Sequence, residues 1–355
     1  MSEPTDLIGR IEDFVGRFVS LPTGCLLPVS VWIAATHVFE VFQHFPYLAI
    51  LSAVKGCGKT RLLQVCECLC RTPMRFAFPS AAVLYRTIEE RKPTLLLDEV
   101  ENLNNPRSET AKDIRAILNA GFEAGGSVPR IGGKRFDKVQ HFSVFCPKAF
   151  AAIGNLPETV AHRSIIVRMQ RQRPTESVER FTRKRVQPQA QSLKGEITAC
   201  LGKAKSRIEA AYEACDDLDF LRDREADCWL PLFAVCEVLS PDRMTDLRDC
   251  AELLSGQKAE ADVDDSLALR LLSDIRRFWP PAEANVSTQD LLTALPMQEH
   301  SPWADEFKLS DRKLARMLRS FGISSRTVRI GDGTAKGYRR EDFDAAFSVY
   351  LPPEE

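Results

Sequence analysis

Short apolar runs alternate with longer stretches of helical spacing in the first half of the chain. In 59–70 and 108–126 the apolar residues recur every three or four positions, which is typical of an amphipathic helix. Ser80 can cap a third helix, which we expect to run to about Arg91. The short runs, rich in residues that favour strands, are 47–52, 74–79, 94–97, 148–155 and 164–169. Strands that alternate with helices predict an α/β fold in which helices cover both faces of a parallel sheet.

The rest of the pattern predicts flanking helical regions and a separate C-terminal domain. Before the first strand, Trp32, Val38, Phe39 and Phe42 are candidate core residues of two helices. Residues 256–266 (GQKAEADVDDS) are polar and acidic, which is typical of a linker. The expected parts are an N-terminal helical arm at 1–45, a core at 46–172, a helical region at 173–256 and a C-terminal domain at 267–355.

The composition is that of an ordinary globular protein. Of the 355 residues, 44% are hydrophobic and 27% are charged, and the formal net charge is −1. This charge gives no overall attraction to nucleic acid or to an anionic membrane, so such binding needs local patches. The apolar stretch 25–35 is about half as long as a membrane span, and the first residues lack the pattern of a secretory signal. Eleven scattered cysteines then predict reduced thiols in a cytoplasmic protein.

A glycine-containing loop follows the apolar run at 47–52. Residues 53–60 fit A-x-x-x-x-G-K-T, the pattern of a phosphate-binding loop (P-loop), in which glycines let backbone N–H groups turn towards phosphate oxygens. Lys59 can reach the β- and γ-phosphates, and Thr60 can coordinate Mg²⁺. The positive end of the following helix also faces the phosphates. The candidate nucleotide-binding residues are Ala53, Lys55, Gly56, Cys57, Gly58, Lys59, Thr60 and Arg61.

An acidic pair ends the apolar run at 94–97. We expect Asp98 to hold the magnesium hydration shell, and Glu99 to orient and deprotonate an attacking water. Together with the loop upstream, the pair predicts a site that binds ATP and Mg²⁺ and hydrolyses the nucleotide. Each motif has a simpler alternative: a glycine turn that precedes a helix, and a strand that runs into an acidic turn.

The chain resembles two families, one broad and one narrow. Residues 46–255 resemble the AAA+ branch of P-loop ATPases, above all in A-x-x-x-x-G-K-T and LLLDE. This implies an ATPase core at 46–172 and a helical lid at 173–256. Segments such as PYLAILSAVKGCGKTRLL and RDREADCWLPLFAV are similar to a bacterial family of undefined function. Its members occur on phage, plasmid and other mobile-element proteins, often beside primase modules, which implies helicase-type work in replication and a primase as a candidate partner.

The AAA+ resemblance also implies roles for single residues. Asn155 would be the sensor 1 residue, which helps to position the attacking water. Arg163 would be an arginine finger, which stabilises charge on the nucleotide of a neighbouring subunit. Arg224 would be the sensor 2 arginine, which touches the γ-phosphate in its own subunit, with Arg222 as its competitor. The alternatives are a loop cap for Asn155 and ordinary ion pairs for the arginines.

Residues 126–145 predict a basic β-hairpin, because two extended pieces flank a Gly-Gly pair. By resemblance to AAA+ helicases of viral and archaeal replication type, such a hairpin enters the central channel of a ring and grips a nucleic-acid backbone. Its candidate nucleic-acid-binding residues are Arg130, Lys134, Arg135 and Lys138. The alternative is a surface hairpin whose charges keep an edge in solution.

Residues 267–355 resemble a winged-helix domain, because helices are followed by a glycine-turned ribbon. On such a domain one helix enters a DNA groove and the ribbon contacts phosphates. The candidate cations are Arg312, Lys313, Arg316 and Arg319 on the helix, and Arg326, Arg329, Lys336, Arg339 and Arg340 on the ribbon. The alternative is a winged-helix module that binds a protein.

The sequence as a whole predicts a Mg²⁺-dependent ATPase in a homo-oligomeric ring, expected to be a hexamer, that translocates on DNA or remodels it. A single strand would contact the hairpin and a duplex the winged helix, and no membrane contact is expected. The main alternative is an ATP-controlled initiator or loader that binds duplex DNA without translocating. A small-molecule kinase fits less well, because the acidic pair suits activation of water.

Overall fold

The chain forms two compact units, Met1–Gly256 and Gln257–Glu355. The computed structural model describes residues 6–77, 79–105, 108–132, 138–172, 177–215, 218–280, 283–298, 301–304, 307–331 and 333–351.

A five-stranded parallel sheet forms the centre of the first unit, and this confirms the α/β prediction. Its strand order is β2-β3-β6-β1-β7, and every neighbouring pair is parallel. The strands are β1 (Tyr47–Ser52), β2 (Pro73–Ala77), β3 (Thr94–Asp98), β6 (Lys148–Ile153) and β7 (Ser164–Arg168). All residues of β1 are buried because the strand lies between β6 and β7, which explains its uninterrupted apolar run. The parallel arrangement places all five carboxyl ends at one edge of the sheet and all five amino ends at the other.

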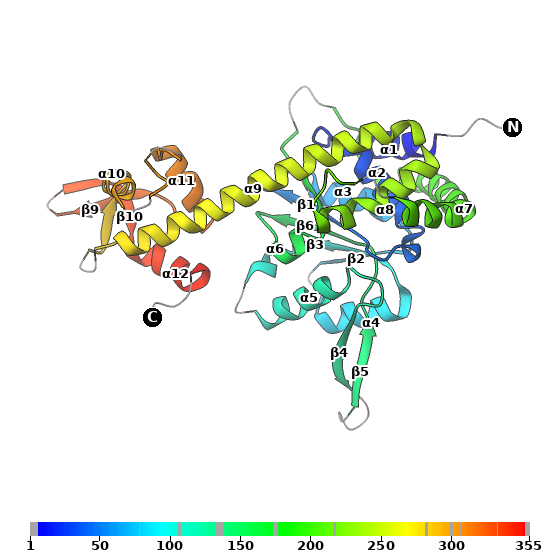
Figure 1. Ribbon diagram of the computed structural model, residues 1–355, viewed down its shortest axis with the longest axis horizontal. Helices are drawn as coiled ribbons and strands as arrows, with labels where there is room; N and C mark the ends of the chain where they lie inside the picture. The colour runs from blue at the N-terminus through cyan, green and yellow to red at the C-terminus, as the bar shows by residue number, and fades with distance from the viewer. Residues whose placement is uncertain are drawn as a thin grey trace. The chain divides into compact units, whose positions relative to one another are not determined.

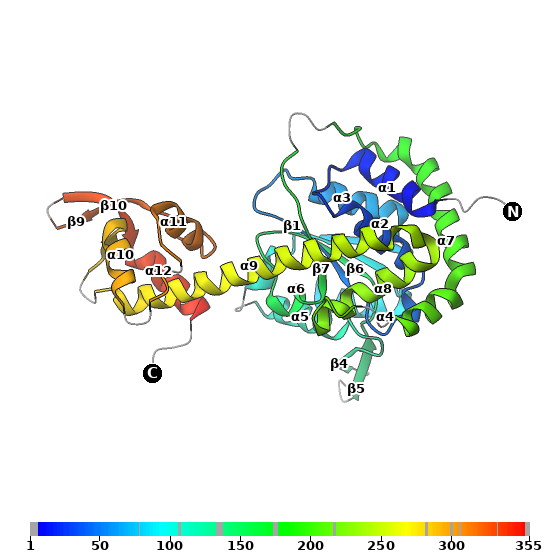
Figure 2. The same ribbon diagram turned by 45° about the horizontal axis from the view of Figure 1, so that its top comes forward.

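Helices flank the sheet (Figures 1 and 2). The helix α3 (Lys59–Leu69) contacts α1 (Leu7–Phe18) and α7 (Arg183–Ala214), whereas α4 (Ala81–Arg91) contacts α5 (Glu109–Ala120). The short α6 (Glu158–Ala161) connects β6 to β7, and the 3-10 turn η2 (Glu101–Asn104) follows β3.

Capping residues and glycines set the bounds of these helices. The Ser80 hydroxyl accepts a hydrogen bond from the backbone N–H of Val83, so the expected cap of α4 is confirmed. The helix α5 ends at Ala120, whereas the pattern predicted an end near residue 126. A Cβ at Gly121 would lie 2.3 Å from the carbonyl oxygen of Val144, and one at Gly126 would lie 1.8 Å from that of Ala120. The chain therefore turns back against the end of α5 at positions that only glycine can occupy.

The N-terminal arm packs into the core of the first unit. It contains α1, α2 (Leu26–Ala35) and the 3-10 turn η1 (Phe39–Val41). The predicted core residues are confirmed, because Trp32, Val38, Phe39 and Phe42 are all buried. His37 lies beside them, and its Nε2 donates a hydrogen bond to the Leu69 carbonyl oxygen at 2.9 Å, while burial lowers the pKa of its ring to about 4.

Long helices follow the last strand of the sheet. They are α7, α8 (Asp223–Leu239) and α9 (Met244–Phe278), with the 3-10 turn η3 (Pro241–Arg243) before α9. Residues 256–266, which we expected to form a linker, lie inside α9, so that prediction is wrong. The segment has no proline and contains several strong helix formers, and polar composition alone does not distinguish an exposed helix from a loop.

The hairpin predicted at 126–145 is confirmed as β4 (Ser127–Gly132) paired with β5 (Lys138–Ser143). It extends outwards beyond α4 and α5 (Figure 1). Its base is fixed to α4, because the Phe142 and Tyr85 rings lie 4.5 Å apart and the Glu89 carboxylate accepts a hydrogen bond from the Ser143 N–H.

Within the described residues, the second unit contains the C-terminal part of α9, a small antiparallel sheet and further short helices. The strand order of this sheet is β8-β10-β9. The glycine-turned ribbon that the sequence predicted is confirmed, because β9 pairs with β10 in antiparallel orientation. In residues 287–295, a serine with an acid three positions later predicts a capped helix, and this is confirmed because Ser287 and Asp290 form a reciprocal capping box. The elements are β8 (Asn285–Ser287), α10 (Thr288–Ala294), η4 (Leu295–Met297), α11 (Asp311–Arg319), β9 (Arg326–Ile330), β10 (Gly333–Arg339) and α12 (Arg340–Tyr350). The helical spacing of residues 310–323 predicts that Leu314, Met317, Leu318 and Phe321 face inward. The first three are buried in α11, whereas Phe321 follows the helix and is half-buried.

None of the eleven cysteines, which all lie within the described ranges, forms a disulfide. Within the described ranges, no helix combines the length and apolar character that crossing a membrane requires.

Candidate functional site

The predicted P-loop connects the carboxyl end of β1 to the first turn of α3. Gly56 and Gly58 have φ angles of 79° and 84°, the left-handed region that glycine adopts at no steric cost. Ala53, Lys55 and both glycines are exposed, whereas Cys57 is buried with its sulfur 3.3 Å from the Val54 carbonyl oxygen. The loop therefore presents exposed backbone at the edge of the sheet, and the buried thiol anchors it.

Lys59 is held in place by a residue that the motif does not contain. Its Nζ donates a hydrogen bond to the Ser52 hydroxyl at 2.6 Å, and that hydroxyl in turn donates to the Val54 carbonyl at 2.7 Å. No carboxylate pairs with Lys59 in the part of the chain that the structure describes. Sequence reasoning missed Ser52. The available signal was a hydroxyl residue at the end of a buried strand, directly before the loop.

The loop and the acidic strand meet at the same edge of the sheet. The Thr60 hydroxyl lies 3.4 Å from an Asp98 carboxylate oxygen, although the two residues come from α3 and the end of β3. A hydroxyl and a carboxylate are hard oxygen donors, which Mg²⁺ prefers, and Mg²⁺ usually takes only one or two protein ligands beside water and phosphate oxygens. The described residues hold no cluster of three or more His, Cys, Asp or Glu that could bind a metal by itself. The pair therefore fits a magnesium ion bound together with a phosphate group.

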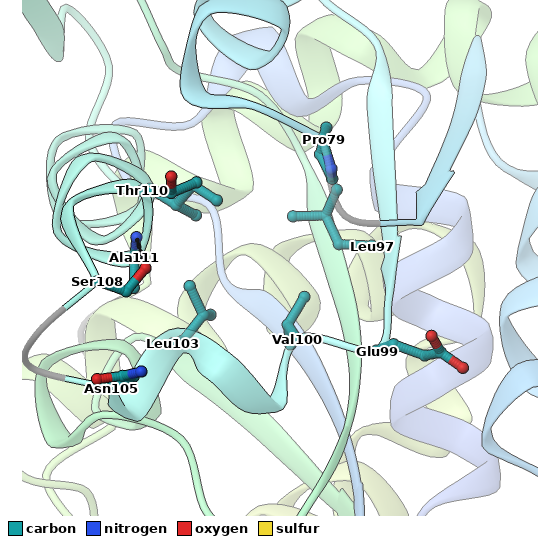
Figure 3. A pocket seen from close by; sticks show the side chains of 10 residues that line it. Pro79, Leu97, Glu99, Val100, Leu103, Asn105, Ser108, Thr110 and Ala111 are labelled. Atoms are coloured by element: carbon teal, nitrogen blue, oxygen red, sulfur yellow. Dashed lines mark hydrogen bonds between the residues drawn. The ribbon is translucent and has the colours of Figure 1, made fainter.

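Glu99 follows Asp98 in a strained backbone conformation. Its φ of 59° is uncommon for a residue with a side chain, and such conformations often occur at functional sites. A cavity of about 260 Å³ lies on one side of Glu99, lined mainly by apolar side chains such as Val100 and Leu103. Figure 3 shows that the Glu99 carboxylate points away from the other labelled side chains of this cavity. Glu99 is therefore an exposed residue that borders the cavity and directs its carboxylate away from it.

Asn155 follows β6, the strand between β1 and β3, and so lies at the same carboxyl edge. Its side-chain oxygen accepts a hydrogen bond from Arg168 at 3.4 Å, and its carbonyl oxygen accepts one from Asn104 of η2. Arg168 ends β7 and places a cation at this edge, which sequence reasoning missed. The available signal was an arginine at the end of the run SIIVR.

Arg163 lies at the opposite edge of the sheet. It precedes β7, and its carbonyl oxygen accepts a hydrogen bond from the N–H of Tyr47, the first residue of β1. Its guanidinium donates to the Thr159 carbonyl and lies 5.9 Å from the centre of the Phe122 ring. Burial lowers the pKa of Arg163, and the nearby charge of Arg224 lowers it further.

Arg224 lies near Arg163, in the first turn of α8, and is exposed. One turn later, Asp227 lies 3.5 Å from the ring of His44, which precedes β1. Strands as long as β1 and β7 span about 17–20 Å from end to end. Arg163 and Arg224 lie at the amino ends of these strands and the P-loop at the carboxyl ends, so neither guanidinium can reach the P-loop of its own chain. The expected sensor 2 contact of Arg224 within its own subunit is not formed in this structure, because α8 begins at the amino edge of the sheet. Arg222, its competitor, directly precedes α8 and lies at the same edge, so the sensor 2 role of either arginine stays a prediction.

A hollow of about 350 Å³ adjoins the P-loop. It is lined by loop residues 56–58, by residues 18–20 after α1, and by residues 169–170 and 178–180 after β7. Arg61 also lines it, with its guanidinium 5.1 Å from the Phe181 ring. The structure thus brings the segment after β7 and the N-terminal arm against the loop.

Two of the four hairpin cations, Arg130 and Lys138, lie in the described residues, and their surroundings differ. Arg130 pairs with Asp113 of α5 at 3.0 Å and lies 5.4 Å from the Tyr85 ring, so its side chain is turned towards its own domain. Lys138 begins β5 and is exposed. Lys134 and Arg135 lie outside the described residues.

The basic residues of the second unit fall into two groups. Arg312, Arg316 and Arg319 are exposed at helical spacing on α11, and Lys313 lies 5.3 Å from the Phe307 ring. The other group is the ribbon, where acids of α12 pair with three of the five cations: Arg326 with Asp342, Arg339 with Glu341, and Arg340 with Asp344. No such pair involves Arg329 or Lys336 within the described ranges, and both are exposed.

Comparison with known proteins places the chain in a family. No curated protein matches it. Among solved structures it is similar to "The A form apo structure of NrS-1 C terminal region-CTR", with a TM-score of 0.37 and 10% identity over 96% of this chain and 76% of that chain, a likeness too weak to support an argument. Residues 168–350, more than half of the chain, match the family described as "Protein of unknown function (DUF3631)", and the chain belongs to this family.

Proposed function

We propose that this protein binds ATP with Mg²⁺, hydrolyses it, and couples hydrolysis to movement on DNA or remodelling of DNA. The observation that carries the proposal is the 3.4 Å approach of the Thr60 hydroxyl to the Asp98 carboxylate. These residues come from two motifs far apart in the sequence, and each alone has an ordinary structural alternative. Their meeting beside Lys59 is what one triphosphate site requires.

Each residue at the carboxyl edge takes one task in this proposal. The loop amides and Lys59 bind the phosphates, and Thr60 and Asp98 hold Mg²⁺, which when bound supplies neutralisation of phosphate charge. Glu99 accepts the proton of the attacking water, since its carboxylate is exposed beside Asp98. Asn155 and Arg168 orient the water and the γ-phosphate from the tips of β6 and β7.

The hollow beside the loop is proposed to hold the adenine base. Its volume of about 350 Å³ lies in the range of small-molecule sites, and its wall includes loop residues 56–58, which ties it to the phosphates. The N-terminal arm would then sense whether nucleotide is bound, because residues 18–20 form part of the same wall.

A ring of identical subunits, expected to be a hexamer, is proposed because Arg163 lies at the edge opposite to its own P-loop. A cation there can act only on the nucleotide of a neighbouring copy. Such an arginine typically contributes about 10³–10⁵ in rate. In the finer description of the fold, 46–172 is an AAA+ core, α7 and α8 are its lid, and the second unit is a winged helix. Replication of a mobile element, with a primase as partner, is the corresponding biological setting.

A second candidate is an ATP-controlled initiator or loader, favoured by the exposed arginines of α11. Arg312, Arg316 and Arg319 share one face of that helix and suit the phosphates of a duplex. A protein that only binds duplex DNA needs this surface but does not need the hairpin.

ATP hydrolysis by the purified chain tests the proposal. A translocase requires that single-stranded DNA stimulates hydrolysis, and that Lys134→Ala with Arg135→Ala removes the stimulation while nucleotide binding stays intact. An initiator would bind duplex DNA with slow turnover, and a kinase would consume ATP only with a small acceptor. A chain that neither binds nor hydrolyses ATP would overturn the whole proposal.

A further inference from the structure

The two faces of the hairpin β4–β5 have different surroundings. One face packs against its own domain, because Val128 is buried, Phe142 contacts the Tyr85 ring, and Arg130 pairs with Asp113. Successive residues of a strand point to opposite faces, so the residues between these point away from the domain.

An aliphatic pair lies on that opposite face. Ile131 and Val139 are cross-strand partners, and 69% and 65% of their surfaces are exposed. No other large hydrophobic residue described in the first unit exceeds 45%. The next pair along the ribbon, Pro129 and His141, is exposed as well. We call these four residues, Pro129, Ile131, Val139 and His141, the outer face.

We propose that the outer face contacts the bases of single-stranded DNA, while the exposed Lys138 of the same hairpin contacts a phosphate. This inference rests on the proposed function and adds a second mode of contact to it. The purely structural role of the pair is to hold the two strands together, but threonine would do this as well, because it shares the β-branched shape. A polar pair would also keep the ribbon in solution at lower risk of aggregation.

Charge decides which occupant fits the outer face. Besides Arg130, which pairs with Asp113, the segment 126–145 contains three Lys or Arg residues and one acid, so the charge favours a ligand that is anionic as well as apolar. A second copy of the hairpin would bring like charges together, which disfavours it. An unpaired strand combines phosphates with apolar rings that every base presents, whereas a duplex encloses its bases. The proposal therefore commits to single-stranded DNA.

Binding measured over a range of salt concentrations separates the two modes of contact. The full chain, with a non-hydrolysable ATP analogue, is titrated onto a labelled oligo-dT and onto an abasic strand of equal length. The variant Ile131→Thr with Val139→Thr keeps the strand propensity and removes apolar surface. We expect it to bind oligo-dT about three- to tenfold more weakly at every salt concentration, with an unchanged slope. The matched variant Lys138→Gln is expected to lower the slope by about 0.7, the value for one phosphate contact.

The abasic strand provides the control. It keeps the phosphates but has no bases, so the wild type and the threonine variant should bind it equally. Tyrosine at both positions should tighten binding to oligo-dT, because aromatic rings stack on bases. Equal binding of oligo-dT by the wild type and the threonine variant would overturn the inference, and so would equal losses on the two strands. A change in assembly state would instead identify the pair as a contact between copies. Hydrolysis of ATP by the wild type, measured without DNA, tests the proposed function separately.

Discussion

The replacement Lys59→Met tests the proposed nucleotide site most directly. Methionine keeps an unbranched side chain of similar length and removes the charge. In the structure the ammonium of Lys59 is already positioned by the Ser52 hydroxyl at 2.6 Å, and no acid within the described ranges pairs with it. Little reorganisation is therefore needed before it meets a phosphate, so most of the charge interaction contributes to binding.

The expected loss follows from Coulomb's law. A cation 3–4 Å from a phosphate oxygen contributes about 4–5 kcal/mol per unit charge at an effective dielectric constant near 20. Lys59 is half-buried and the loop is exposed, so desolvation and screening by salt reduce this to about 2–3 kcal/mol. That difference corresponds to about 30- to 150-fold weaker binding of MgATP.

Thermal unfolding with and without MgATP measures the effect. At a nucleotide concentration of 100 times Kd, the wild type gains about 2.7 kcal/mol, which raises the midpoint of a unit of this size by about 5–10 °C. For a variant with a Kd 100-fold higher, the same concentration gives about 0.4 kcal/mol, or about 1 °C. The matched control is Lys205→Met, an exposed lysine on α7, which should retain the full shift. A full shift in Lys59→Met would refute the assignment of Lys59 to the phosphates.

Three further predictions concern single residues. Glu99→Gln should bind ATP as the wild type does but hydrolyse it about 10²–10⁴ times more slowly, as loss of a general base requires; unchanged turnover would remove Glu99 from the mechanism. Arg163→Ala should also lose ATP hydrolysis. Mixing this variant with Glu99→Gln should restore part of the activity, because some neighbouring subunits in a mixed assembly then combine an intact Arg163 with an intact Glu99. No recovery of hydrolysis in the mixture would argue against action between subunits. Burial lowers the pKa of His37 to about 4, below the unfolded value of 6.5, so the unfolded state binds the extra proton first and stability falls as pH drops from 6.5 towards 4. The wild type should lose about 2–3 kcal/mol of folding stability over this range, after a discount for the partial exposure of His37. Thermal midpoints of the wild type and of His37→Gln, measured from pH 7 to pH 4, should show a smaller loss in the variant. An equal fall of the midpoint with pH in the two proteins would contradict the prediction.

Local signals determined much of the fold. The alternation of apolar runs and helical spacing predicted the parallel sheet, because strands buried on both faces need uninterrupted apolar residues. The core positions of the N-terminal arm, the caps at Ser80 and Ser287 and the hairpin also followed from short-range patterns. These features depend on a few neighbouring residues, and therefore a single sequence carries them.

Features that depend on the spatial placement of distant segments could not be predicted. The polar composition of 256–266 indicated a linker, but the segment is part of α9. The resemblance to AAA+ ATPases implied a lid helix for Arg224, but only the packing of α8 shows that this helix begins at the amino edge of the sheet, beside Arg163. Arg168 and Ser52 reach the candidate site because β1 and β7 are neighbours with their carboxyl ends aligned.

The sequence by itself determined which residues could do chemistry, since a P-loop and an acidic pair are local patterns. It could not determine whether they meet. The tertiary structure decided this by placing β3 and β1 on either side of β6, with the P-loop and Asp98 at one edge and Arg163 at the other. The physical reason is that strand order and direction are set by the burial of whole faces of the sheet, which no short stretch of sequence contains.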